Sequence, residues 1–70
     1  MQSLKINGVE RQFATGEMPA TLAELLAELS IEPNAVVAEV DGAIVRVEDF
    51  ARTQLEHGQA IELIRFMGGG

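Results

Sequence analysis

The sequence predicts an α+β domain in which a mixed sheet wraps around a single helix. Two dipeptides are typical of hairpin turns, Asn7-Gly8 beside an alternating apolar stretch and Asp41-Gly42 between two short apolar stretches. Between these two hairpins lies one amphipathic stretch rich in leucine, which predicts the helix. A chain of 70 residues has room for one domain with a single small core.

The first hairpin is expected within LKINGVERQF, residues 4–13. Leu4 and Ile6 alternate with a polar residue, which is the period of a strand with one buried face. Asn7-Gly8 then supplies two residues that tolerate a positive φ angle, and the chain returns over residues 9–13.

A helix is predicted to begin at Thr21. Thr21 and Glu24 have the spacing of a capping box, in which a hydroxyl and a carboxylate three residues apart accept from unpaired amides at the helix start. Pro33 prevents the helix from continuing, so we expect about three turns. The apolar residues share one face, which should cover the sheet: Leu22, Leu25, Leu26 and Leu29.

Three further segments complete the predicted order. A second hairpin is expected from Val36–Val40 through Asp41-Gly42 to Ala43–Val45. Residues 47–55 carry mixed signals, and we expect a short helical or irregular crossover held by two apolar side chains, those of Phe50 and Leu55. The last strand is expected over residues 60–66, beside the first strand.

Composition limits the partners of the chain. Five Lys and Arg against eleven Asp and Glu give a formal net charge of −6, which repels phosphate backbones and anionic lipids. We therefore expect no nucleic acid and no membrane as a partner, and favour a basic protein surface. The start of the chain lacks the pattern of a signal peptide, so the cytoplasm is the expected location.

No residue pattern predicts a catalytic or metal site. The chain has no cysteine, which excludes a disulfide, a Cys-based metal site and a Cys nucleophile. The one histidine, His57, precedes Gly58 and is interpreted as a turn residue. Glu48 and Asp49 are adjacent carboxylates, which without further ligands are typical of a solvated face or a helix start.

The last predicted strand carries apolar residues on both faces. Ile61 and Leu63 share one face, and Ile64 and Phe66 share the other. If Ile61 and Leu63 pack inward, Ile64 and Phe66 form an exposed apolar patch with Val37 adjoining, which we interpret as a partner-binding site. The alternative is that a curled sheet buries this patch.

Three glycines, Gly68, Gly69 and Gly70, end the sequence. A carboxylate that must enter a narrow channel of another protein needs a thin leader, and three residues without Cβ reach at most about 10 Å. Side chains would obstruct such a channel. The alternative is a frayed tail with no role, for which any polar residues would serve.

Taken in this order, the elements resemble the ThiS family, the sulfur carriers of bacterial thiamine biosynthesis, which have the β-grasp or ubiquitin-like fold. The resemblance spans essentially the whole chain, through KINGVER, TLAELLAELSI, VDGAIVRVEDFARTQLEHGQAIELIRF and the terminal glycines. It implies a β-grasp domain over residues 1–67 and a flexible glycine tail over residues 68–70. Gly68 is one glycine more than the Gly-Gly pair with which the family ends.

The resemblance also implies that the chain is a carrier and not an enzyme, with no cofactor bound by the chain itself. A ubiquitin-activating-type adenylyltransferase, using ATP and magnesium, would adenylate the Gly70 carboxylate after docking on the apolar patch. A sulfur-donor protein would complete the thiocarboxylate, and thiazole synthase would take up the sulfur. Two alternatives stay open: a carrier like the small subunit of molybdopterin synthase, and a non-covalent ubiquitin-like binding module or conjugation tag.

Overall fold

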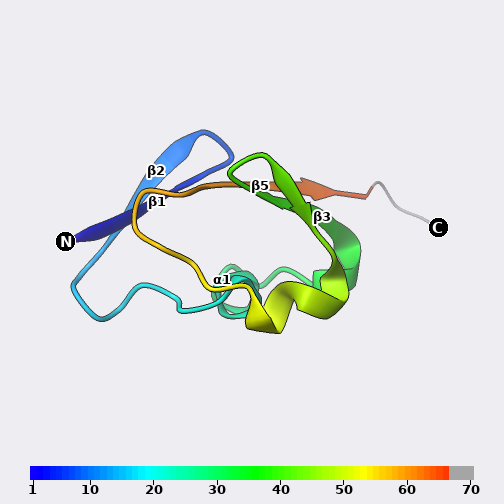
Figure 1. Cartoon of the computed structure of the whole chain (residues 1–70), viewed down its shortest axis with the longest axis horizontal. Helices are drawn as coiled ribbons and strands as arrows, with labels where there is room; N and C mark the ends of the chain where they lie inside the picture. The colour runs from blue at the N-terminus through cyan, green and yellow to red at the C-terminus, as the bar shows by residue number, and fades with distance from the viewer. Residues whose placement is uncertain (67–70) are drawn as a thin grey trace.

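The computed structural model describes residues 1–66, which form a five-stranded mixed sheet with the helical elements beneath one face (Figure 1). The strands in chain order are β1 (Gln2–Ile6), β2 (Val9–Phe13), β3 (Val36–Val40), β4 (Ala43–Val45) and β5 (Ala60–Arg65). The helical elements are α1 (Leu22–Glu28) and two 3-10 helices, η1 (Pro33–Ala35) and η2 (Val47–Arg52). The predicted order of hairpin, helix, hairpin, crossover and strand is confirmed.

Both hairpin turns lie where the sequence predicts them. Asn7 and Asp41 have φ angles of 49° and 51°, and the glycines that follow, Gly8 and Gly42, have φ angles of 82° and 85°. Two successive residues at positive φ form a type I′ turn, whose twist matches that of the flanking strands. The turns therefore set the antiparallel registers of β1 with β2 and of β3 with β4.

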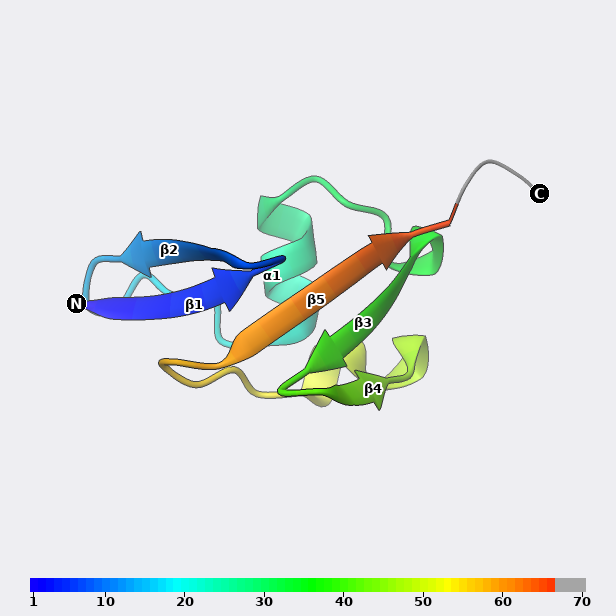
Figure 2. The same ribbon diagram turned by 90° about the horizontal axis from the view of Figure 1, so that it is seen from above.

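The last strand occupies the centre of the sheet, whose order is β2-β1-β5-β3-β4 (Figure 2). β5 runs parallel to β1 and antiparallel to β3, so the prediction that the last strand lies beside the first is confirmed. The strand ends at Arg65, one residue before its predicted end. Phe66 keeps one bond of the ladder, because its N–H donates to the carbonyl of Ala35 at 2.9 Å.

The start of α1 has the predicted cap in a slightly altered form. The Thr21 hydroxyl accepts from the backbone N–H of Glu24 at 3.2 Å. The Glu24 carboxylate accepts from the N–H of Ala20 at 3.2 Å, one residue farther back than a standard capping box requires. Two unpaired amides at the helix start are thereby satisfied.

The helix is shorter than predicted, with seven residues rather than about three turns. The reason is a C-terminal cap at Ser30, whose φ angle is 59°. The N–H of Ser30 donates to the carbonyl of Ala27 at 3.1 Å, and the N–H of Ile31 donates to that of Leu26 at 2.9 Å. This pair of bonds is the Schellman motif, in which glycine is the usual residue at the left-handed position.

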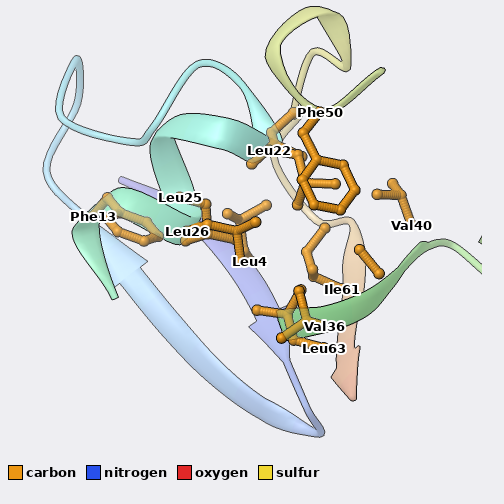
Figure 3. Packing of buried hydrophobic residues seen from close by; sticks show 12 residues of the cluster. Leu4, Phe13, Leu22, Leu25, Leu26, Val36, Val40, Phe50, Ile61 and Leu63 are labelled. Atoms are coloured by element: carbon orange, nitrogen blue, oxygen red, sulfur yellow. The ribbon is translucent and has the colours of Figure 1, made fainter. Parts of the chain in front are cut away.

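A single core fills the space between the sheet and the helical elements (Figure 3). The predicted anchors of the crossover, Phe50 and Leu55, are buried in it, whereas Leu29 is only partly buried at its margin. The core residues are Leu4, Phe13, Leu22, Leu25, Leu26, Val36, Ala38, Val40, Phe50, Leu55, Ile61 and Leu63.

The side chain of Asn7 extends the pairing of β5 beyond the end of β1. In the register of β1 and β5 only Lys5 with Ala60 and Ile6 with Ile61 are paired. The Asn7 side-chain oxygen accepts from the N–H of Leu63 at 2.7 Å, and its amide nitrogen donates to the Leu63 carbonyl at 3.2 Å. One side chain therefore replaces a missing rung of the ladder.

We predict that Asn7→Gly lowers the free energy of unfolding by about 1–2 kcal/mol, because glycine keeps the positive φ but leaves both Leu63 groups without this partner. Urea unfolding measures the change. Ser30→Gly is the control, since Ser30 also has a positive φ and its exposed side chain makes no hydrogen bond within residues 1–66. Equal stability of Asn7→Gly and the parent would contradict the bridging role of the amide.

Candidate functional site

One face of the sheet is left uncovered by the helical elements of residues 1–66 (Figure 1). On β3 and β5, the residues of this face alternate with buried ones, and the register of β4 with β3 places Ile44 beside Glu39. We call them the outer face: Val37 and Glu39 on β3, Ile44 on β4, and Glu62 and Ile64 on β5. Because a single short helix shields only the opposite face, apolar side chains on the outer face meet solvent.

The predicted apolar patch is exposed at one end of this face. Val37 and Ile64 are directly opposite each other in the register of β3 and β5. Ile64 is 52% exposed and Phe66 is 61% exposed, whereas Val37 is half-buried. The alternative that a curled sheet buries Ile64 and Phe66 is wrong, because both side chains are exposed.

Phe66 lies beyond the end of β5 and differs in its surroundings from the other two. It lines an open hollow of about 320 Å³ together with Arg65 and residues of the connection from α1 to η1 that include Ile31. The structure thus brings Val37 and Ile64 together as a cross-strand pair. It places Phe66 at the end of the sheet, two residues farther along the chain.

The strand that carries Ile64 also leads to the predicted glycine site. β5 points away from the N-terminus toward the opposite end of the sheet (Figure 2). Met67, Gly68, Gly69 and Gly70 lie outside the described residues, so the flexible tail and the role of Gly70 stay predictions.

A row of two carboxylates adjoins the patch. Glu39 lies opposite Glu62 on β5 and opposite Ile44 on β4, and the three side chains form one row across the outer face. Neither carboxylate makes an ion pair or a hydrogen bond within the part of the chain that the structure describes. No local pattern in the sequence indicates this pair, because the two residues become neighbours only through the register of β3 with β5.

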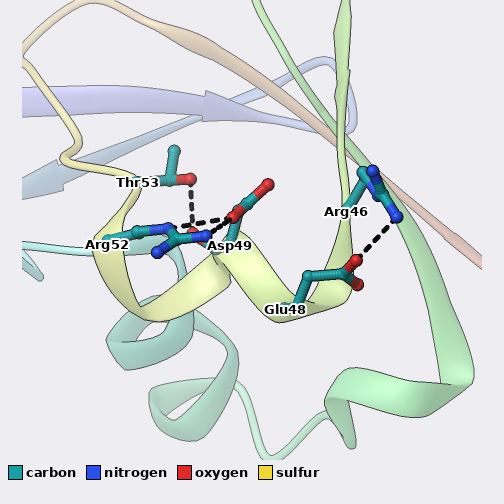
Figure 4. Close-up of polar contacts among 5 residues, drawn as sticks. All are labelled: Arg46, Glu48, Asp49, Arg52 and Thr53. Atoms are coloured by element: carbon teal, nitrogen blue, oxygen red, sulfur yellow. Dashed lines mark hydrogen bonds and ion pairs between the residues drawn. The ribbon is translucent and has the colours of Figure 1, made fainter.

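The other carboxylates considered in the sequence have structural partners (Figure 4). Glu48 pairs with Arg46 at 2.8 Å, and Asp49 forms an ion pair with Arg52, whose Nε donates to it at 2.9 Å. The Thr53 hydroxyl donates to the Asp49 carbonyl at 2.7 Å. Their interpretation as residues of a helix start is confirmed, since both lie in the first turn of η2.

The remaining polar signals are also structural. His57 lies in the turn before β5, as predicted, and its Nδ1 accepts from the N–H of Ser3 at 2.9 Å. Among residues 1–66, no three His, Asp or Glu side chains are close enough to hold a metal ion. No helix of the described part has the length and apolar character needed to cross a bilayer.

The architecture defines the class of protein. A mixed sheet of five strands, with the last strand central and parallel to the first and one helix across the inner face, is the β-grasp or ubiquitin-like fold. The predicted fold class is therefore confirmed.

Similarity to known proteins specifies the family within this class. The chain matches the ThiS family over residues 4–70. A crystal structure of thiamine biosynthesis protein ThiS from Geobacter metallireducens is 30% identical, with a TM-score of 0.79 over 97% of this chain and 99% of that chain. A solution structure of a thiamine biosynthesis protein from the same organism is 32% identical, with a TM-score of 0.78 over 97% and 87%. The chain belongs to the ThiS family of thiamine-biosynthesis sulfur carriers.

A longer protein contains a similar segment. The chain is 34% identical over 67 residues to a thiazole synthase of Paramagnetospirillum magneticum. The matched region is 96% of this chain and 20% of that protein, so this chain spans about a fifth of the length of this curated relative.

The exposure of Ile64 separates it energetically from its neighbour Leu63, which is buried. We predict that Leu63→Ala lowers the free energy of unfolding by about 2–5 kcal/mol, whereas Ile64→Thr changes it by no more than about 0.5 kcal/mol. Chemical denaturation of both variants measures the difference. A large loss for Ile64→Thr would mean that Ile64 serves the fold rather than a partner.

Proposed function

We propose that this chain carries sulfur for thiazole formation as a thiocarboxylate on Gly70. The observation that carries the proposal is the ThiS match over residues 4–70, which includes the three terminal glycines. The absence of cysteine supports it, because sulfur then cannot be held as a persulfide of this chain. The carboxylate of Gly70 is the group that adenylation and sulfur transfer would convert to a thiocarboxylate.

The conversion needs activation by another protein. A carboxylate is a poor electrophile, and its oxygen must first attack the α-phosphate of ATP, which yields an acyl-adenylate and releases pyrophosphate. A persulfide on a donor protein then attacks the carbonyl carbon and AMP leaves, so that the chain is joined to the donor as an acyl disulfide. A second thiol of the donor protein attacks the donor-side sulfur, which releases the thiocarboxylate and leaves a disulfide on the donor. The adenylyltransferase binds the ATP and magnesium, so this chain serves as its substrate and not as a catalyst.

The proposed acceptor of the sulfur is thiazole synthase. The similarity of this chain to a segment of a protein named thiazole synthase supports that choice, because two proteins that act on each other are often joined in one polypeptide. The ThiS match favours the thiamine carrier over a molybdopterin-synthase small subunit. The second alternative is a non-covalent ubiquitin-like module. The loading experiment below would exclude it if sulfur is added at Gly70 and would support it if no sulfur is added.

We predict that incubation with ATP, magnesium, an adenylyltransferase and a sulfur donor adds the mass of sulfur replacing oxygen, located by fragmentation at Gly70. The loaded chain should react with thiol-directed alkylating reagents, which leave the cysteine-free parent untouched. A chain with one residue added after Gly70 is the control and should stay unadenylated, because the acyl group is displaced. Loading without ATP, or a label elsewhere in the chain, would rule out the sulfur-carrier proposal.

We further propose that the patch of Val37, Ile64 and Phe66 docks the adenylyltransferase. Ile64→Ala and Phe66→Ala should each weaken binding by about 1–3 kcal/mol, because each removes apolar area that the partner would bury. Val9→Ala is the control, since Val9 is as exposed as an apolar residue of the patch but lies on the edge strand β2. Calorimetric titration measures the affinities, and unchanged values for both patch variants would show that docking occurs elsewhere.

A further inference from the structure

Two carboxylates are placed directly opposite each other at the centre of the outer face. The backbone bonds on either side, Asp41 to Ala60 and Phe66 to Ala35, show which residue pairs of β3 and β5 exchange hydrogen bonds. These pairs alternate along an antiparallel ladder, so Glu39 and Glu62 are one of them and their Cα atoms are about 5.5 Å apart. Both side chains point away from the core.

This placement costs stability, since like charges directly opposite on neighbouring strands repel each other. No cation of residues 1–66 forms an ion pair with either carboxylate. Lys5 is exposed on the outer face of β1, opposite Glu10 on β2 and Ala60 on β5 rather than opposite Glu62. Arg65 is opposite the buried Val36 and therefore lies on the other face. The other three arginines have partners of their own in the pairs Arg11–Glu28, Arg46–Glu48 and Arg52–Asp49.

Apolar side chains border the carboxylate pair on two sides. Val37 and Ile64 form the next row of the outer face with the same orientation. Ile44, which is 69% exposed, lies beside Glu39 on β4. A partner that covers these apolar residues removes water from around the two carboxylates, and a buried anion pair then requires a cation at the same place.

The geometry selects the kind of cation. A guanidinium is planar and presents donors on several edges, so one arginine can donate to two carboxylates that project side by side from adjacent strands. A compact ammonium group has no such fork. The net charge of −6 favours the approach of a basic protein surface in general, and the carboxylate pair determines where on the chain that surface docks.

We propose that the outer face docks a protein surface centred on an arginine, whose guanidinium lies between Glu39 and Glu62 while apolar groups around it cover Val37, Ile44 and Ile64. The identity of the partner, the adenylyltransferase, rests on the proposed function above. The carboxylate pair and its apolar border thus form one binding surface, in which the repulsion present in the free chain is relieved on docking.

The decisive variant is the double substitution Glu39→Gln with Glu62→Gln, which keeps the shape and removes both charges. Its dissociation constant from the adenylyltransferase should rise at least about tenfold, and the salt dependence of binding should decrease. The matched control is Glu17→Gln with Glu56→Gln, which removes the same charge from exposed loop positions and should bind like the parent. In thermal unfolding, the first variant should be no less stable than the control, because its change relieves repulsion.

Chemical modification identifies the arginine. Phenylglyoxal reacts with exposed guanidinium groups, and peptide mass spectrometry shows which arginine of the adenylyltransferase is protected when the carrier is bound. One arginine should be protected by the parent chain and by the loop control, and lose its protection with the Glu39→Gln, Glu62→Gln variant at a concentration that saturates the enzyme. Equal affinity of the two double variants, or the same arginine pattern with both, would overturn the proposal.

The parent chain separates this inference from the proposed function. If the adenylyltransferase does not load the parent with ATP and a sulfur donor, the proposed function fails. If the adenylyltransferase loads both the parent and the Glu39→Gln, Glu62→Gln variant, and binds the two with the same dissociation constant, the proposed function stands and the proposed arginine site fails.

Discussion

The domain depends on the burial of Ile61 and Leu63, two side chains of the strand β5, which lies between β1 and β3. β5 contributes these side chains to the core beneath the sheet, and its two neighbours satisfy most of its backbone groups. Where β1 ends too early, the amide of Asn7 takes its place. Since a single helix covers only the inner face, the same strand presents its alternate residues to solvent. The inner face of β5 therefore serves the core, and its outer face is the one on which we propose that a partner docks.

Much of the fold could be predicted because its signals are local. The pairs Asn7-Gly8 and Asp41-Gly42 determine turn conformation within two residues, and the leucine period determines which side of the helix is buried. The end of the helix was missed because Ser30 occupies a left-handed position where glycine is the usual signal. The bond from Asn7 to Leu63 joins residues 56 positions apart, so no local pattern could indicate it.

In the candidate site, too, one feature could be predicted from local sequence patterns and another could not. The exposure of Ile64 followed from strand periodicity and the presence of one helix, both of which are visible in the sequence. The opposition of Glu39 and Glu62 depends on the register of β3 against β5, two strands separated by a turn, a short strand and a crossover. Sequence periodicity gives the face on which a residue lies, but only tertiary structure gives its neighbour on that face.

The central position of β5 has a mechanical consequence. The strand is joined to β1 on one side and to β3 on the other, so a pull on its C-terminal end loads both ladders of backbone bonds in shear, and the bonds share the force. An edge strand pulled outward would instead open one bond at a time. Amide hydrogens in such a strand exchange with solvent mainly when the whole domain opens. A protein that binds the chain beyond Phe66 can therefore pull on β5 without first unfolding a part of the domain.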